Sequence, residues 1–76
     1  LPQQELEHML TERELETLSL LADGLVKKEI AEKLGISVST VVTHVCNIYV
    51  KLNVKNAPSA IAKAFRLGIL SIDEME

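Results

Sequence analysis

Apolar residues recur along this chain at intervals of three and four residues, a spacing that places them on one face of an α-helix. Short polar or glycine-containing segments separate four such stretches. They predict helices over about residues 11–23, 26–34, 38–52 and 57–67. We therefore expect an all-α fold of four helices, with a three-helix core and a fourth helix added at the C-terminal end.

Local signals mark where these helices begin. Thr11 and Glu14 have the spacing of a capping box, in which each side chain accepts a hydrogen bond from the backbone amide of the other residue. Ser37 is expected to cap the third helix, and Asn56 or Ala57 to cap the fourth. Glycines are expected to end the first and fourth helices: Gly24 and Gly68.

Residues 27–46 have the organisation of a helix-turn-helix motif. Residues 35–37 alone join the second and third predicted helices, and Gly35 permits the positive φ that so short a connection needs. The turn fixes the two helices at a steep angle and leaves one face of the third helix bare. An apolar stripe is expected to hold the opposite face in the core, with the first two of its residues against the first helix: Val41, Val45, Ile48 and Leu52.

The bare face of residues 38–52 is expected to enter the major groove of a DNA duplex, which has about the width of a helix. Thr43 and Asn47 can hydrogen-bond there, whereas Val42 and Val50 offer only apolar contact, for example with a thymine methyl group. The base-facing residues are predicted to be Val42, Thr43, Cys46, Asn47 and Val50. Phosphate contacts are predicted from hydroxyls and amides at the start of this helix and from nearby cations: Lys27, Lys28, Ser37, Ser39, Thr40 and Lys51.

Charge is unevenly distributed along the chain. The formal net charge of −3 argues against a nucleic-acid partner if it is taken as one number. Residues 1–23 carry −5, residues 24–72 carry +5 and residues 73–76 carry −3. Because salt screens charges beyond about 8–10 Å, local charge decides what a surface binds. A basic central segment fits a phosphate-facing surface, although an ordinary solvated mixture of charges explains it equally well.

Length and composition narrow the class of protein. Seventy-six residues make one domain, whose core must be built from aliphatic residues because Tyr49 and Phe65 are the only aromatics. No apolar run is long enough to span a bilayer and no signal peptide opens the chain, so we expect a cytoplasmic, nucleoid-associated protein. The chain begins with Leu1 rather than Met. We therefore interpret residues 1–9 as a linker tail from a missing N-terminal regulatory domain, and residues 6–71 as the helix-turn-helix domain.

The sequence contains no clear catalytic or metal-binding pattern. His44 and Cys46 are two residues apart on a helix and point in different directions, so they cannot hold one metal ion together. His44 is better explained as a structural residue, and Cys46 as an unreactive thiol on the exposed face. Without a nucleophile–base pair or a ligand cluster, we expect no enzymatic activity, no cofactor, no metal and no small-molecule ligand.

Four segments of the chain resemble the LuxR-type, or GerE-like, DNA-binding domain of bacterial transcription regulators. Region 4 of sigma factors shares the LTxRE and EIAxxLG elements, but the His44 to Val54 string and the fourth helix favour the LuxR type. The matching segments cover nearly the whole chain in the family's order: LTERELETLSLLADG at 10–24, KEIAEKLGIS at 28–37, TVVTHVCNIYVKLNVKN at 40–56 and AIAKAFRLGIL at 60–70.

The resemblance implies a function and a partner arrangement. The third helix would lie in the major groove, with Lys28 and Thr40 on phosphates and residues 42, 43 and 46 at base edges. The fourth helix would join two copies in a homodimer, and the whole would serve a two-component response regulator or a ligand-sensing regulator that also meets RNA polymerase. Dimer contacts are expected at three residues, although Ala62 is equally explained as a good helix former: Ala62, Phe65 and Arg66.

The chain also departs from the pattern of the family it resembles. Val42 stands where lysine is usual and Cys46 where a polar or basic residue is common, while Thr17 occupies a normally apolar position and Leu15 a usually charged one. Because a lysine at position 42 would supply a cationic contact, we hypothesise weak or partner-assisted DNA binding that depends on dimerisation. The alternative is a degenerate helix-turn-helix that acts as a protein-interaction module with weak DNA binding.

Overall fold

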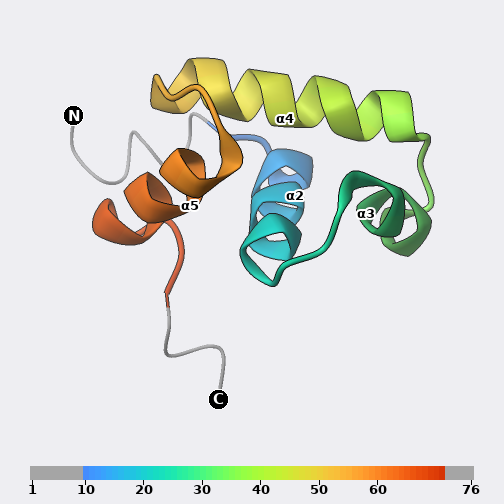
Figure 1. The fold of residues 1–76 in the computed structure, drawn as a ribbon, viewed down its shortest axis with the longest axis horizontal. Coiled ribbons are helices and arrows are strands. Elements are labelled where there is room, and N and C mark those ends of the chain that lie inside the picture. Colours follow the sequence, from blue (N-terminus) through green and yellow to red (C-terminus); the bar gives the residue numbers. More distant parts are fainter. Residues whose placement is uncertain (1–9, 72–76) are drawn as a thin grey trace.

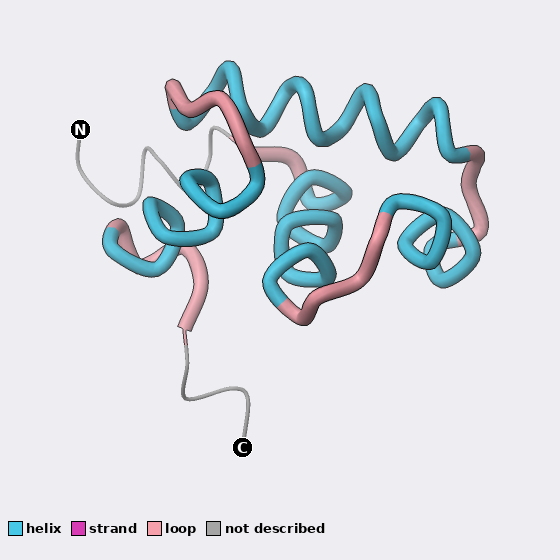
Figure 2. Tube along the Cα trace, in the orientation of Figure 1, coloured by secondary structure: helices cyan, strands magenta, loops and turns pink. Residues whose placement is uncertain are grey.

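The computed structural model describes residues 10–71 and contains four helices in that range, with no strand (Figures 1 and 2). The helices are α2 (Glu12–Ala22), α3 (Lys27–Leu34), α4 (Val38–Leu52) and α5 (Ala57–Arg66). The predicted all-α fold of four helices is confirmed. The linker tail predicted for residues 1–9 and residues 72–76 lie outside the described residues.

Side-chain caps begin three of these helices, as the sequence predicts. At α2, the Thr11 hydroxyl accepts from the Glu14 amide at 3.1 Å, and the Glu14 carboxylate accepts from the Thr11 amide at 2.9 Å. The Ser37 hydroxyl accepts from the Thr40 amide at 3.1 Å to begin α4. The Asn56 side chain caps α5, accepting from the Ser59 amide at 2.9 Å. These bonds satisfy amides that have no partner inside the helix, so they set where each helix starts.

The turn between α3 and α4 has the conformation that its glycine predicts. Gly35 has a φ of +68° and a ψ of 36°, in the left-handed region that disfavours residues with a Cβ atom. Asn53, which follows α4, adopts a similar left-handed conformation with a φ of 57°. Both helices therefore stop at a residue type that tolerates this region. Only three residues separate the end of α3 from the start of α4.

The helices α3, α4 and α5 are arranged around α2. In Figure 1, α4 lies along one edge of the molecule, and α2 runs beneath it between α3 and α5. α4 packs against each of the other three helices. None of the helices within residues 10–71 combines the length and apolar character that crossing a membrane requires.

Two clusters of buried residues hold α4 to the other helices. The α3 cluster joins the N-terminal half of α4 to α3 and consists of Ile30, Ala31, Val41 and Val45. The α2/α5 cluster joins the C-terminal half of α4 to α2 and α5 and consists of Leu10, Leu18, Ile48, Leu52, Ala60 and Ala64. All four residues of the predicted stripe on α4 are buried. Val41 and Val45 pack in the cluster with α3, and α2 contributes the half-buried Leu20 and Leu21 to it.

Candidate nucleic-acid interface

The outer side of α4 is exposed along its whole length. The five residues predicted to face bases are all exposed, with Val42 39% and Val50 79% exposed as whole residues. The opposite side of the helix is the buried stripe, so α4 has one face in the core and one face in solvent. Figure 1 shows the consequence: α4 forms an outer edge of the molecule, and α2, α3 and α5 all lie on its inner side.

The exposed face of α4 consists of two parallel ridges, because residues four apart lie one above the other on a helix. An apolar ridge contains only exposed side chains: Val38, Val42, Cys46 and Val50. A polar ridge runs beside it and contains Ser39, Thr43 and Asn47, which are exposed, and Lys51, which is half-buried. Within this polar ridge the Thr43 hydroxyl donates to the Ser39 carbonyl at 3.1 Å, which leaves its oxygen lone pairs toward solvent.

Hydroxyl groups gather at the N-terminal end of α4. The Ser37 hydroxyl lies 3.0 Å from the Ser39 hydroxyl and 2.8 Å from the Thr40 hydroxyl. No acidic residue occupies the first turn of this helix. The positive end of the helix dipole and a set of hydroxyl groups are therefore presented together, which suits a phosphate.

The three lysines predicted to contact phosphate are placed differently. Lys27 and Lys28 are exposed in the first turn of α3. Lys51, near the C-terminal end of α4, donates to the Glu14 carboxylate, with 2.7 Å between Lys51 Nζ and Glu14 Oε1. Its ammonium group is thus already paired with α2, and Lys51 would have to leave Glu14 to reach a phosphate.

Glu14 is the most unexpected residue near this surface. Its side chain is 3% exposed and accepts from both Lys51 and the Thr11 amide. Burial alone would raise the pKa of this carboxyl, but the hydrogen bonds from Lys51 and Thr11 and the charges of Lys51 and His44 outweigh it and lower the pKa. Glu14 is therefore an ionised carboxylate that links the start of α2 to α4.

Sequence reasoning treated Glu14 as a helix-start acid and missed its burial. The available signal was its position four residues before Leu18, which places both side chains on the same face of α2. Leu18 is fully buried, and so is Thr17 beside it. Thr17, at a position where the family resemblance leads us to expect an apolar residue, satisfies its hydroxyl by donating to the Arg13 carbonyl at 2.8 Å.

The predicted dimer contacts on α5 divide into two kinds. Ala62 and Arg66 are exposed, whereas Phe65 is half-buried. The opposite face of α5 carries the buried Ala60 and Ala64, whose small side chains allow close approach to its neighbours. α5 is further tied to α4 by Lys63, which donates to the Leu52 carbonyl at 2.6 Å.

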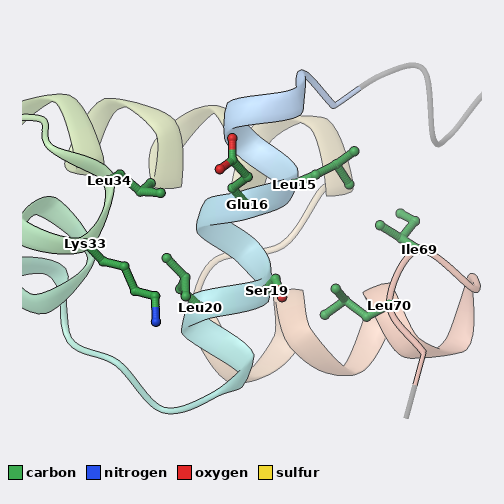
Figure 3. Close-up of a pocket in the computed structure, with 8 residues that line it drawn as sticks. All are labelled: Leu15, Glu16, Ser19, Leu20, Lys33, Leu34, Ile69 and Leu70. Atoms are coloured by element: carbon green, nitrogen blue, oxygen red, sulfur yellow. The ribbon is translucent and has the colours of Figure 1, made fainter. Parts of the chain in front are cut away.

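A hollow of about 440 Å³ lies away from the outer face of α4 (Figure 3). α2, the end of α3 and the segment after α5 line it, and no residue of α4 does. The residues that line it are Leu15, Glu16, Ser19, Leu20, Lys33, Leu34, Ile69 and Leu70. Leu15, at a position of α2 where the family resemblance leads us to expect a charged residue, thus lines this hollow.

Comparison with known proteins identifies the class to which this fold and surface belong. Residues 8–64 match the family described as bacterial regulatory proteins, luxR family, and the chain belongs to that family. Its four helices are the helix-turn-helix domain of the luxR family, as the resemblance in the sequence implies.

Individual relatives agree with this assignment. The chain is 46% identical over 66 residues to the response regulator protein VraR of Staphylococcus aureus, and equally to that of Staphylococcus saprophyticus. The matched region is 87% of this chain and 32% of each of those proteins, so the chain spans about a third of the length of these relatives.

Two solved structures have the same fold. The transcription factor GerE is 41% identical, with a TM-score of 0.78 over 83% of this chain and 94% of that chain. The response regulator ChrA of a heme-sensing two-component system is 43% identical, with a TM-score of 0.78 over 80% of this chain and 30% of that chain.

Proposed function

We propose that this chain is the sequence-specific DNA-binding domain of a bacterial transcription regulator, with α4 as the helix that enters the major groove. The observation that carries the proposal is the two-sided character of α4: one side is buried in both core clusters, and the other is exposed along the whole helix. A helix exposed along one whole side, and held rigidly from behind, has the shape that major-groove recognition needs.

The proposed contacts follow from where the side chains lie. Base edges would meet the exposed ridges of α4, through Val42, Thr43, Cys46, Asn47 and Val50. Phosphates would meet the hydroxyl groups of Ser37, Ser39 and Thr40 at the start of α4, and the exposed lysines Lys27 and Lys28 of α3. Lys51 joins them only if DNA competes successfully with Glu14 for its ammonium group.

We further propose that the domain acts as a homodimer joined through α5, with contacts at Ala62, Phe65 and Arg66. The exposed Ala62 and Arg66 support this, because the small side chain of Ala62 lets a second helix approach closely and arginine is enriched at protein interfaces. By analogy with VraR and ChrA, which are named as response regulators, the chain would be the output part of a longer cytoplasmic regulator that also meets RNA polymerase.

The proposal is tested by titrating the 76-residue chain into fluorescently labelled random-sequence duplex DNA at low salt. Lys28→Glu should weaken binding by about tenfold, since it reverses a charge at a proposed phosphate contact. Thr43→Ala should weaken it less. Lys33→Glu is the matched control, because this substitution reverses the same charge at a residue that lies beside the hollow and away from α4.

The protein-interaction alternative predicts a different result. The apolar ridge of α4 and the paired state of Lys51 favour it as the second candidate. If Lys28→Glu, Thr43→Ala and Lys33→Glu all leave DNA binding unchanged, the exposed face of α4 is not a DNA contact. That outcome assigns this face to another regulator or to RNA polymerase.

A further inference from the structure

We propose that the exposed face of α4 selects A·T base pairs, with Val42 reading the methyl group of thymine and Asn47 reading adenine. This inference rests on the proposed function and names the class of DNA sequence that the same surface recognises. Three observations carry it: the apolar ridge, the neighbouring polar ridge and the absence of an unpaired lysine or arginine on α4.

The apolar ridge is matched to thymine. Val38, Val42 and Val50 are 45%, 39% and 79% exposed, although the valine side chain carries no group that can hydrogen-bond to water. In the major groove, the C5 methyl group of thymine is the one apolar group that an ordinary base pair presents. A valine that leaves water against this methyl group buries apolar surface on both partners, which is favourable.

The polar ridge is matched to adenine. An asparagine amide can donate to N7 and accept from the N6 amino group of adenine at the same time. Asn47 is exposed, and within residues 10–71 its side chain makes no hydrogen bond. Thr43, one turn earlier, donates to the Ser39 carbonyl, so its oxygen is left to accept from an amino group such as adenine N6.

Guanine lacks a partner on this face. Its major-groove edge presents two acceptors, O6 and N7, and the side chains that pair with both are arginine and lysine. Residues 38–50 contain no lysine, arginine, aspartate or glutamate. Lys51, the one lysine or arginine of α4, is held by the buried Glu14 at 2.7 Å near the end of the helix.

The preference for A·T over G·C pairs therefore has two sources: a favourable contact with thymine and an unfavourable one with guanine. A valine placed over guanine removes water from the O6 and N7 acceptors without replacing their hydrogen bonds, which is unfavourable. The same valine over thymine covers a methyl group that water solvates poorly. The half-site is expected to be rich in A·T pairs at the positions that face Val42 and Asn47.

The experiment begins with selection of bound duplexes from a random-sequence library by the 76-residue chain at low salt. The enriched duplex is then resynthesised with deoxyuridine in place of each thymine, which removes only the C5 methyl group. We expect enrichment of A·T pairs, and weakening of about fourfold for each contacted thymine that is replaced.

Variants locate the effect on α4. Val42→Ala should abolish the difference between thymine and deoxyuridine at one position, whereas Val26→Ala, the same change at an exposed valine outside α4, should preserve it. Val42→Lys should shift the selected base toward guanine, because a lysine can donate to both O6 and N7 of that base. Both changes at position 42 replace an exposed side chain, and circular dichroism should show an unchanged helical content.

The outcomes separate this inference from the function on which it rests. Tight binding to duplexes that are rich in G·C, or equal binding of thymine and deoxyuridine duplexes, overturns the A·T inference and leaves DNA binding intact. Failure of the wild-type chain to bind any duplex overturns the proposed function and this inference together.

Discussion

The two ends of α4 are attached to the molecule by different means. At the C-terminal end, Ile48 and Leu52 pack into the larger α2/α5 cluster, and two lysines add polar links to neighbouring helices. At the N-terminal end, Val41 and Val45 pack into the smaller α3 cluster, and a three-residue turn sets the angle to α3. The difference indicates that the C-terminal end supplies most of the stability, while the N-terminal end sets the geometry of the helix-turn-helix.

This division leaves the outer face of α4 with little structural role. Its exposed residues make no contribution to either cluster, so they can differ between related domains without cost to the fold. A surface of this kind is where DNA preference can change.

Leu18→Ala should be the most damaging substitution of those considered. Leu18 is fully buried in the α2/α5 cluster, and truncation leaves a cavity as well as removing buried surface. We expect a loss of about 3 kcal/mol in the free energy of unfolding, measured by urea denaturation. Val50→Ala, at an exposed position of α4, should change it by less than about 0.5 kcal/mol. Equal losses at the two positions would contradict the division.

Glu14→Gln should have the next largest effect, because it removes the charged partner of Lys51. We expect a loss of about 2 kcal/mol, reduced from that of a fully buried pair because the Lys51 side chain is 31% exposed. Glu16→Gln is the control, since Glu16 makes an exposed pair with Arg13 at 3.8 Å. In a double-mutant cycle, Lys51→Met should cost much less once Glu14 has been replaced. Additive losses would show that the pair is not coupled.

Low pH should weaken the ion pair between Glu14 and Lys51. The pKa of Glu14 is lower in the folded chain than the ordinary glutamate value of about 4.3. The ionised carboxylate therefore contributes stability that is present above the ordinary pKa and is lost as the pH falls through the lower, folded pKa. Urea midpoints measured from pH 7 down to pH 3 should decrease over the acid end of this range. The decrease should be smaller in Glu14→Gln, and an unchanged decrease would assign it to other carboxyl groups.

Gly35→Ala should reduce stability less than Leu18→Ala or Glu14→Gln does, but it should also affect DNA binding. No atom lies within 4 Å of a Cβ built on Gly35, so the cost is the left-handed backbone conformation itself, about 1 kcal/mol. Gly35→Asn should cost less, because asparagine tolerates this region. If Gly35→Ala relieves its strain by moving α3 against α4, DNA affinity should fall more than stability predicts. A stability loss as large as that of Leu18→Ala would show that the turn is a packing site.

Interactions within one helix, or between one helix and the next, were predictable from the sequence. The capping box of Thr11 and Glu14, the cap of Ser37 and the left-handed Gly35 all depend on residues a few positions apart. The buried stripe of α4 and its exposed opposite face follow from helical periodicity alone. For the same reason, the resemblance to the LuxR family could be read from short segments of the chain.

Interactions between distant residues were decided by the tertiary structure. Glu14 and Lys51 are 37 positions apart, and each is unremarkable in its own helix until α2 and α4 cross. Likewise, the angles at which the helices pack determine which cluster Val41 and Val45 join. They also bring Leu15 and Leu70 together in the lining of one hollow. Local sequence thus determined the helices and the exposed face, because backbone hydrogen bonds and periodicity act over a few residues. Only packing could decide which charges are paired, because pairing depends on positions in space that the order of residues does not specify.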